Sequence, residues 1–336
     1  MNNSIIVEDV SKIVARVDLS ELKNKKILIT GATGLMGTYF IYYIIEAAKE
    51  QIVPEKLTII HLQPLPKFLK IMEEYEWIEI LCGDLSDNNF IQTLEEYDYI
   101  IHFAGYGQPA KFNIDQAKTI KLNTTLTMEL LERLKQNGKF LFASSSGIYN
   151  GLVKESYKEE DVGTTNTLHP RACYIEGKRC GEAIINAYRA KGINAKSARI
   201  SYTYGPGVRK SDERALYSFI KKGLQGVINL LDNGDAQRIY CYVADVVELL
   251  WNILLFGKKP IYNVGGIEKI TILELAQKIA SKLEAQVILP KEIQSIQGNA
   301  VLERLNMEHT LEEFPMEFLS LDDGLARTIQ WYKKNY

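Results

Sequence analysis

A glycine-rich segment near the N-terminus limits the folds open to this chain more than any other feature. Residues 31–37, Gly-Ala-Thr-Gly-Leu-Met-Gly, directly follow the largely apolar run 26–30 and directly precede the apolar run 38–48. A short run with β-branched residues is typical of a buried parallel strand, and the longer run is typical of a helix. The segment therefore predicts a strand, a tight turn and a helix, in that order.

A turn of this kind binds the phosphates of a dinucleotide, because each glycine has its own steric role. Gly31 permits the tight turn, Gly34 lets the backbone approach a pyrophosphate, and Gly37 lets the helix pack closely on the sheet. The helix N-terminus offers N–H groups that have no partner inside the helix. We predict cofactor contacts by Gly31, Thr33, Gly34, Leu35, Met36 and Gly37.

The rest of the chain continues to alternate between strand and helix. Strands are predicted near 57–62, 78–82, 98–103, 139–144 and 195–200, and helices near 88–96, 118–136 and 172–191. Such alternation gives a parallel sheet covered by helices on both faces, with ligand-binding loops at one edge. The predicted fold class is therefore α/β, a Rossmann-type doubly wound parallel sheet. Gly205-Pro206-Gly207 marks the start of a smaller C-terminal substrate-binding lobe.

A tyrosine and a lysine four residues apart, Tyr174 and Lys178, are the second informative feature. On a helix these positions share one face, so the lysine ammonium can lie near the phenol and favour its ionised form. An ionised tyrosine can act as a base near neutral pH. The spacing also arises by chance on amphipathic helices, and it becomes informative only together with the glycine-rich turn.

Four further motifs follow in order along the chain. They are Gly-Asp-Leu at 83–85, Ile-His-Phe-Ala-Gly at 101–105, Lys-Leu-Asn-Thr-Thr at 121–125 and Ser-Ser-Ser-Gly-Ile-Tyr at 144–149. With the Gly-x-x-Gly-x-x-Gly turn and the Tyr-x-x-x-Lys pair, they resemble the extended short-chain dehydrogenase/reductase superfamily. The similarity is to its NAD-dependent nucleotide-sugar epimerases, dehydratases and decarboxylases in particular. It covers about residues 25–330.

The resemblance assigns a role to residues of each motif. It implies that Tyr174 takes a proton from a sugar hydroxyl at C4, that Ser145 hydrogen-bonds the same oxygen, and that Lys178 holds the nicotinamide ribose and stabilises the phenolate. A transient keto-sugar would result. It further implies cofactor contacts by Asp84, Leu85, Ala104, Gly105, Asn123, Tyr174 and Lys178, with Asn123 also in a structural and proton-relay role.

The chain is predicted to have three regions. Apolar residues at helical intervals predict that residues 1–24 form an N-terminal helical extension that packs on the core or on a partner subunit. The resemblance implies that residues 25–204 form the NAD(P)-binding Rossmann domain with the catalytic Tyr and Lys, and that residues 205–336 form mainly the nucleotide-sugar lobe, with some segments returning to the Rossmann domain. In the resembling family, helices equivalent to 118–136 and 172–191 form a four-helix bundle between subunits. A homodimer is expected, although the same apolar stripes also suit a monomer core.

Cationic side chains of the C-terminal lobe are candidates to bind the diphosphate of a nucleotide sugar, because a guanidinium forks onto phosphate oxygens. Arg209, Arg214 and Arg238 are such candidates, each with a solvated salt bridge as its alternative role. Arg238 is the strongest, since residues 238–246 resemble the family segment Arg-x-Phe-x-x-Val-x-Asp-Val. Substrate contacts are also predicted for Ser145, Ser146 and Tyr202, the last standing where relatives usually have Asn.

Gly147 bears on the reaction that follows ketone formation. In the resembling family, 4,6-dehydratases carry an Asp-Glu pair directly after the catalytic Ser or Thr, UDP-glucuronate decarboxylases carry Glu at this position, and epimerases typically carry a small residue. We therefore predict an NAD-dependent nucleotide-sugar epimerase. A UDP-glucuronate decarboxylase-like enzyme is the first alternative, because residues 170–179 resemble that subfamily. A nucleotide-sugar reductase or dehydrogenase is another, and a noncatalytic dinucleotide-binding protein is the least favoured.

The end of the second strand bears on the choice between NAD and NADP. NAD enzymes usually place Asp or Glu there to bind the ribose 2′-hydroxyl, and NADP enzymes use basic or small polar residues. Residues 58–63, Thr-Ile-Ile-His-Leu-Gln, end in neither kind. The lack of an arginine, and the bound NAD of the resembling internal-redox enzymes, favour NAD with Gln63 as a ribose contact. NADP stays open as the alternative.

Composition argues against several other classes of protein. The 336 residues carry a net charge of −2, which gives no bulk electrostatic reason to bind nucleic acid. No apolar run approaches the roughly 20 residues that span a bilayer, and no basic segment followed by a hydrophobic core opens the chain, so we expect no membrane partner and a cytoplasmic location. The four cysteines are isolated and lack histidines at metal-ligand spacing, so no metal site is predicted.

Overall fold

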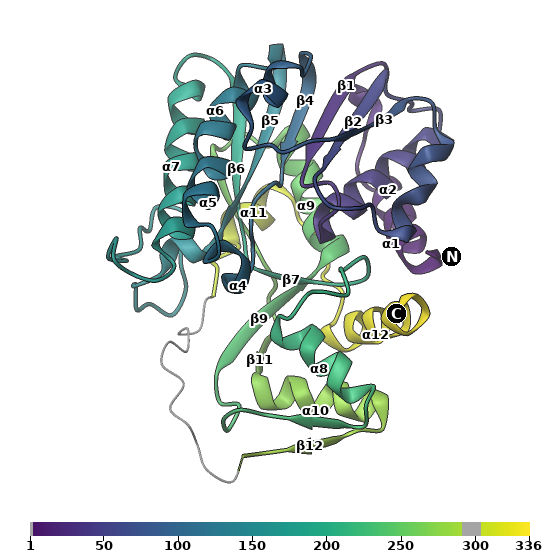
Figure 1. The fold of residues 1–336 in the computed structure, drawn as a ribbon, viewed down its shortest axis with the longest axis vertical. Helices are drawn as coiled ribbons and strands as arrows, with labels where there is room; N and C mark the ends of the chain where they lie inside the picture. Colours follow the sequence, from purple (N-terminus) through teal and green to yellow (C-terminus); the bar gives the residue numbers. More distant parts are fainter. Residues whose placement is uncertain (1–2, 291–303) are drawn as a thin grey trace.

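A seven-stranded sheet forms the larger part of the protein, seen in a computed structural model that describes residues 3–290 and 304–336 (Figure 1). The strand order is β10-β6-β5-β4-β1-β2-β3, and every pairing is parallel. The strands are β1 (Lys26–Thr30), β2 (Lys56–His61), β3 (Ile78–Cys82), β4 (Tyr97–His102), β5 (Leu134–Ser145), β6 (Asn194–Ile200) and β10 (Ile261–Val264). This order confirms the predicted Rossmann-type doubly wound sheet.

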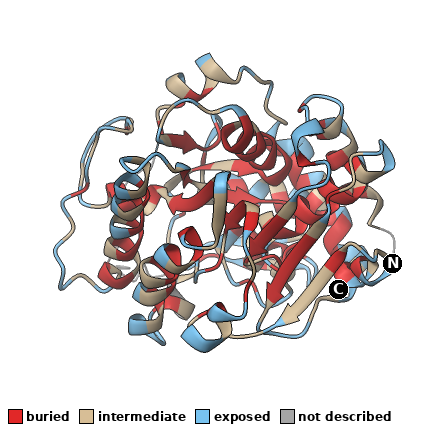
Figure 2. Cartoon of the chain, turned by 90° about the horizontal axis from the view of Figure 1, so that it is seen from above, coloured by how far each residue is buried: buried red, intermediate tan, exposed pale blue. Residues whose placement is uncertain are grey.

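Helices cover both faces of this sheet (Figure 2). The alternation of side chains along β1 explains this arrangement. Ile27 and Ile29 are buried in one apolar cluster, whereas Leu28 between them is buried in the other. The first cluster includes α1 (Ser4–Val14), α2 (Leu35–Lys49) and α9 (Val243–Phe256). The second includes α3 (Asn88–Gln92), α5 (Gln116–Asn123), α6 (Thr125–Leu131) and α7 (Ala172–Arg189).

The helix predicted over 118–136 is interrupted in the structure. It divides at Thr124 into α5 and α6, and residues 134–136 already belong to β5. Thr124 Oγ1 donates to Ile120 O at 2.9 Å, and Thr127 Oγ1 donates to Asn123 O at 2.9 Å. Threonine hydroxyls that bond to the carbonyl four residues earlier bend a helix, which accounts for the break.

The apolar stripes that suggested a homodimer lie largely inside the single chain. Leu122, Leu126, Leu130, Leu131 and Ile185 are buried against the sheet. They therefore do not by themselves indicate a subunit interface, and the homodimer stays a prediction.

The smaller lobe follows β6 and lies beyond one edge of the main sheet (Figure 1). Its three-stranded sheet has the order β11-β9-β7, and a two-stranded sheet pairs β12 with β8. Its elements are β7 (Tyr202–Tyr204), α8 (Ala215–Gly223), β8 (Val227–Asn229), β9 (Gln237–Tyr242), β11 (Lys269–Thr271), α10 (Ile272–Leu283), β12 (Gln286–Ile288) and α12 (Leu321–Asn335). Between β9 and β11 the chain returns to the main sheet through α9 and β10.

The N-terminal helix α1 packs on α2 and α9, so the extension lies on the core of its own chain. Its buried Asp9 accepts hydrogen bonds from Tyr39 Oη at 2.8 Å and Tyr242 Oη at 2.7 Å, and pairs with Arg327 at 2.8 Å. These three partners belong to α2, β9 and α12. The extension therefore ties the first helix of the large domain to the smaller lobe.

The carboxyl ends of the parallel strands meet at the edge of the sheet that faces the smaller lobe. Thr30 of β1 pairs with His102 of β4, and Ser145 of β5 pairs with Ile200 of β6. In open α/β sheets ligands bind at this edge. Within residues 3–290 and 304–336, no helix combines the length and apolar character needed to cross a bilayer.

Candidate active site

A cavity of about 430 Å³ lies between the carboxyl edge of the main sheet and the smaller lobe. The main sheet side contributes residues at the ends of β5 and β6 and the start of α7, among them Ser145, Tyr174 and Lys178. The smaller lobe contributes residues of β7, β9 and α8, among them Arg214 and Arg238. The fold thus brings the predicted catalytic residues and two of the predicted substrate arginines to one cavity.

The glycine-rich turn is built to admit a dinucleotide. Gly31 has a φ of +68°, and a Cβ at this position would lie 2.6 Å from the backbone carbon of Phe103. A Cβ at Gly37 would lie 2.6 Å from the Cα of Ala32. Gly34 is the N-cap of α2, and no side chain caps this helix, so its first N–H groups are left for a phosphate. These features fit the pyrophosphate of a bound dinucleotide.

Tyr174 and Lys178 lie on one face of α7, as their spacing predicts. The Tyr174 ring stacks on Phe112 with centroids 5.0 Å apart, and Lys178 Nζ lies 5.9 Å from the centroid of the Tyr174 ring. Lys178 is buried and donates a hydrogen bond to Ala143 O at 2.6 Å. Burial lowers the pKa of Lys178 to about 7, although the nearby Glu182 carboxylate opposes this shift. The site therefore holds a titratable cation beside the proposed base.

Ser145 and Gly147 line the cavity beside Tyr174. Ser145 ends β5, and its Oγ accepts a hydrogen bond from Gly147 N at 3.1 Å. A Cβ at Gly147 would lie 3.3 Å from Ser145 Oγ and 3.4 Å from Cε1 of Tyr174. Any side chain longer than alanine at residue 147 would therefore occupy the space between the serine and the tyrosine.

Asn123 lies beside Lys178 and has an unused hydrogen-bond acceptor. Its Nδ2 donates to Thr119 O at 2.7 Å, whereas its buried Oδ1 has no partner among the described residues. A Cβ at Gly105 would lie 3.6 Å from this Oδ1 and 3.9 Å from Lys178 Nζ. An acceptor at this place suits the proton-relay role predicted for Asn123.

His102, at the end of β4, links the sheet to α5. Its Nδ1 lies 2.8 Å from Thr30 Oγ1, and its Nε2 lies 3.1 Å from Leu122 O. Burial, with the nearby Lys178 ammonium, lowers the pKa of His102 to about 3. The imidazole is therefore neutral, donates from Nε2 and accepts at Nδ1, and has a structural role.

The residues predicted to contact the adenosine part of the cofactor lie at the ends of β2, β3 and β4. Partial burial of Asp84 is outweighed by hydrogen bonds from Lys118 Nζ at 2.6 Å and Ser86 N at 2.9 Å, which lower its pKa to about 2. Leu85 and Ala104 are buried near it in one apolar cluster. Gln63 is exposed beyond the end of β2, with its carbonyl 3.1 Å from His61 Nδ1.

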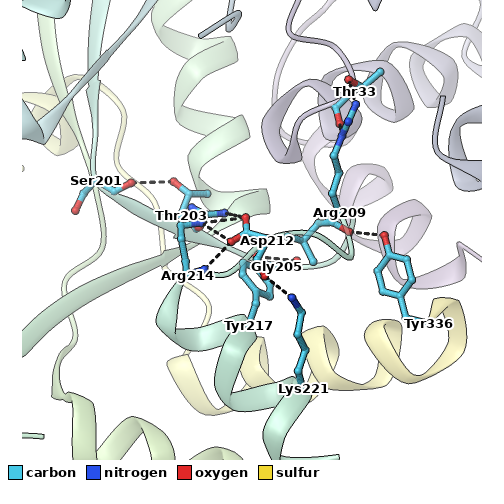
Figure 3. Close-up of polar contacts among 11 residues, drawn as sticks. Thr33, Ser201, Thr203, Gly205, Arg209, Asp212, Arg214, Tyr217, Lys221 and Tyr336 are labelled. Atoms are coloured by element: carbon cyan, nitrogen blue, oxygen red, sulfur yellow. Dashed lines mark hydrogen bonds and ion pairs between the residues drawn. The ribbon is translucent and has the colours of Figure 1, made fainter. Parts of the chain in front are cut away.

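The three predicted substrate arginines do not share one location. Arg214 and Arg238 line the cavity together with Ser146 and Tyr202. Arg214 Nη2 pairs with Asp212 Oδ2 at 2.8 Å, and the Arg238 guanidinium lies 5.6 Å from the centroid of the Tyr202 ring. Arg209 is not part of the cavity lining, and its guanidinium lies against the glycine-rich turn instead (Figure 3).

Two features of the site escaped the sequence analysis. Arg171, the N-cap of α7, lines the cavity, and its guanidinium makes no hydrogen bond or ion pair with any described residue. Its position three residues before Tyr174 was the available signal. Behind the cavity, Arg199 pairs with Glu182 at 2.8 Å, both buried, and donates to Tyr149 Oη at 2.7 Å. Nothing in the spacing of these residues indicates their pairing, which depends on the packing of α7 against β6.

Comparison with protein families and curated proteins places these features in context. A model described as the NAD-dependent epimerase/dehydratase family matches residues 27–265. UDP-glucuronic acid decarboxylase 1 of Danio rerio is 29% identical over 320 residues, which cover 94% of this chain and 74% of that protein. UDP-glucuronic acid decarboxylase 6 of Arabidopsis thaliana is 30% identical over 268 residues, covering 79% of this chain and 76% of that protein.

Solved structures share the fold at lower sequence identity. The dTDP-glucose 4,6-dehydratase DesIV of Streptomyces venezuelae has a TM-score of 0.79 and 21% identity, covering 92% of this chain and 97% of that chain. The UDP-glucuronic acid 4-epimerase of Bacillus cereus, in complex with UDP-glucuronic acid and NAD, has a TM-score of 0.77 and 21% identity. The similarity covers 93% of this chain and 100% of that chain. These similarities extend over both the main sheet and the smaller lobe.

Proposed function

The chain belongs to the NAD-dependent epimerase/dehydratase family, and on that premise we propose that it epimerises a nucleotide sugar at C4 through a transient keto-sugar. The observation that carries this proposal is the position of Gly147 between Ser145 and Tyr174. A glycine there leaves room for the ring of a ketopyranose to rotate. None of the described residues that line the cavity is Asp or Glu, so none of them can protonate a leaving hydroxyl as a carboxylic acid.

The residues of the site have separate tasks in this reaction. Bound NAD supplies the reversible hydride transfer that interconverts a sugar alcohol and its ketone. Tyr174, as phenolate, takes the proton of the C4 hydroxyl and returns it to the ketone oxygen after the ring has turned over. Ser145 donates a hydrogen bond to that oxygen, and Lys178 favours the phenolate when its ammonium is charged. Asn123 Oδ1, which has no partner among the described residues, can accept a hydrogen bond beside Lys178.

The charge of the cavity supports a uronic acid as the sugar. Arg171, Arg214 and Arg238 line the cavity, and Arg214 pairs with Asp212. A diphosphate between Arg214 and Arg238 leaves Arg171, one helical turn from Tyr174, beside the sugar ring. The carboxylate on C5 is adjacent to the reacting C4, so it would lie within reach of this guanidinium. The relatives and structural neighbours named above include enzymes of UDP-glucuronic acid.

Decarboxylation is the second candidate, favoured by the similarity to UDP-glucuronic acid decarboxylases. A ketone at C4 of a uronic acid is β to the carboxylate, so loss of carbon dioxide needs no further catalytic group in principle. The same Tyr174, Ser145 and Lys178 serve both reactions. Gly147 and the missing acid favour epimerisation as the main outcome.

The experiment that tests the proposal is product analysis with a panel of nucleotide sugars. We expect purified protein incubated with UDP-glucuronic acid or UDP-glucose to form an isomer of unchanged mass, without net consumption of NAD, detected by liquid chromatography and mass spectrometry. A product lighter by carbon dioxide would move the assignment to decarboxylation. A product that differs by two hydrogens, with matching cofactor consumption, would move it to net oxidation or reduction.

A pair of tyrosine variants tests whether this cavity is the site of reaction. Tyr174→Phe should abolish turnover and keep NAD binding, because the variant loses only the hydroxyl that moves the proton. Tyr188→Phe is the matched control, since Tyr188 lies on the same helix but hydrogen-bonds Glu132 outside the cavity. Turnover by Tyr174→Phe at the rate of the control would refute the mechanism.

A further inference from the structure

Arg209 makes contacts that a substrate-binding arginine of the smaller lobe would not make. It lies in the loop between β7 and α8, and its half-buried side chain extends to the glycine-rich turn of the large domain (Figure 3). Its Nε donates to Thr33 O at 3.1 Å, and its Nη2 donates to Thr33 Oγ1. These bonds fix the guanidinium at the turn that precedes α2.

No carboxylate among the described residues forms an ion pair with Arg209. By contrast, Arg199 pairs with Glu182, Arg214 with Asp212 and Arg327 with Asp9. Partial burial lowers the pKa of Arg209, although the nearby Tyr336 opposes this shift. Such a charge is costly unless an anion binds beside it.

The turn that Arg209 touches is the place where a dinucleotide would bring such an anion. Thr33 lies between Gly31 and Gly34, and the uncapped N-terminus of α2 leaves N–H groups for phosphate oxygens. A guanidinium forms paired, charge-assisted hydrogen bonds with phosphate. We propose that Arg209 binds the pyrophosphate of the dinucleotide, as a cofactor ligand that comes from the second half of the chain.

The same loop also reaches the substrate cavity. Arg209 O accepts a hydrogen bond from Asp212 N at 3.0 Å, and the Asp212 carboxylate holds Arg214, which lines the cavity. Lys221 Nζ donates to Asp212 O at 2.7 Å, and Gly205 N donates to Tyr217 Oη at 3.0 Å, which tie both ends of the loop to α8. Binding of the dinucleotide at Arg209 therefore also fixes Arg214. This second step rests on the proposed function, because it takes Arg214 as a ligand of the nucleotide sugar.

Calorimetric titration of NAD into NAD-stripped protein tests the first step. Arg209→Gln removes the charge and should weaken NAD binding about 10- to 100-fold, the range of a charge-assisted hydrogen bond. Arg209→Lys keeps the charge but cannot donate two parallel hydrogen bonds to a phosphate. Its NAD affinity should therefore lie between those of the parent protein and Arg209→Gln. Lys210→Gln is the matched control, because it removes one charge from the next residue, whose exposed side chain lies over Tyr336. Its NAD affinity should stay within about 2-fold of the parent protein.

Two comparisons separate a phosphate contact from general damage to the fold. Adenosine, which has no phosphate, should compete with a fluorescent adenosine ligand equally well in the parent protein and in Arg209→Gln. Thermal unfolding of the stripped proteins should show that Arg209→Gln is as stable as the parent, with a smaller stabilisation by added NAD. An unchanged NAD affinity in Arg209→Gln, or an equal loss for adenosine and NAD, would overturn the inference.

Titration of UDP, with and without saturating NAD, tests the second step. We expect NAD to tighten UDP binding in the parent protein and in Lys210→Gln, and to have no such effect in Arg209→Gln. An equal effect of NAD in Arg209→Gln and the parent would overturn the coupling. These binding results are independent of turnover: failure to epimerise any sugar would refute the proposed function and leave the NAD measurements standing.

Discussion

Replacement of Lys178 by methionine should abolish turnover and yet stabilise the folded protein below pH 7. Lys178 is buried, and its pKa is lowered to about 7 from an ordinary 10.5. At 1.36 kcal/mol for each factor of ten, the charged ammonium costs the folded state about 5 kcal/mol, as an upper limit. The lost hydrogen bond to Ala143 O offsets about 1–3 kcal/mol of that gain. A net stabilisation of about 2–4 kcal/mol is therefore expected at pH 6.

The sign of this effect should change with pH. Between pH 7 and 10.5 the unfolded chain keeps the proton of Lys178 and the folded chain releases it, so the stability of the parent protein rises with pH. The advantage of Lys178→Met should fall by about 1.4 kcal/mol for each pH unit in this window. Near pH 10 only the lost hydrogen bond remains, and the variant should be the less stable protein.

Urea denaturation of NAD-free protein from pH 6 to pH 10 measures this difference. Titrations of other groups occur in both proteins and cancel in the comparison. Lys196→Met is the matched control: this buried lysine, far from the cavity near the start of β6, has its pKa lowered to about 8 by burial. The stability difference between Lys196→Met and the parent should vary with pH in the same direction. The charged Lys196 ammonium costs the folded state less, about 3 kcal/mol, and the variant should keep turnover. A difference between Lys178→Met and the parent that does not vary with pH would refute the reasoning.

Substitutions at three further positions have definite expected outcomes. Gly147→Ala should lower kcat about 10-fold by narrowing the space beside Ser145. Gly147→Glu should abolish epimerisation or release carbon dioxide from a uronic acid. Full epimerase activity of Gly147→Glu in the product assay would contradict the proposal that Gly147 leaves room for the sugar ring. Glu182→Gln leaves the charge of Arg199 buried without its partner and should cost about 3–5 kcal/mol in urea denaturation, whereas a loss below about 1 kcal/mol would show that the pair is solvated. In Gly31→Ala the added methyl group would be strained by the φ of +68° and would clash with the backbone of Phe103, so the variant should lose bound NAD. If denaturation released as much NAD from this variant as from the parent protein, the steric account would be contradicted.

Most of the main sheet could be predicted because its strands are largely apolar runs bounded by turn residues, although β10 at its edge was not predicted. The strands predicted near 57–62, 78–82 and 98–103 match β2, β3 and β4 to within one residue. The break between α5 and α6 could not be predicted from apolar spacing, because it depends on the hydroxyl of Thr124 bonding to the backbone. The short strands of the smaller lobe pair between segments that are distant in sequence, and local patterns contain little information about them.

The meeting of Ser145 and Tyr174 at one cavity could be predicted for a topological reason, whereas the separate location of Arg209 could not. Parallel strands bring their carboxyl ends to one edge, so Ser145 and the start of α7 had to lie near the glycine-rich turn. The direction of the loop that carries Arg209 depends on its contacts with α8, and sequence analysis grouped this residue with the substrate arginines. Arg171 was missed because, apart from Tyr174 and Lys178, residues 170–179 were used only for their resemblance to a decarboxylase subfamily.

The most direct test of the central claim uses a nucleotide sugar that carries deuterium at C4. The protein would be incubated with labelled UDP-glucuronic acid or UDP-glucose, and the product analysed by NMR and mass spectrometry. If the hydride leaves C4 and returns within one site, as proposed for Tyr174, Ser145 and Lys178 with bound NAD, the C4 epimer should keep the deuterium at C4 and the mass of its substrate. An epimer with solvent hydrogen at C4, or a product without inversion at C4, would contradict the account.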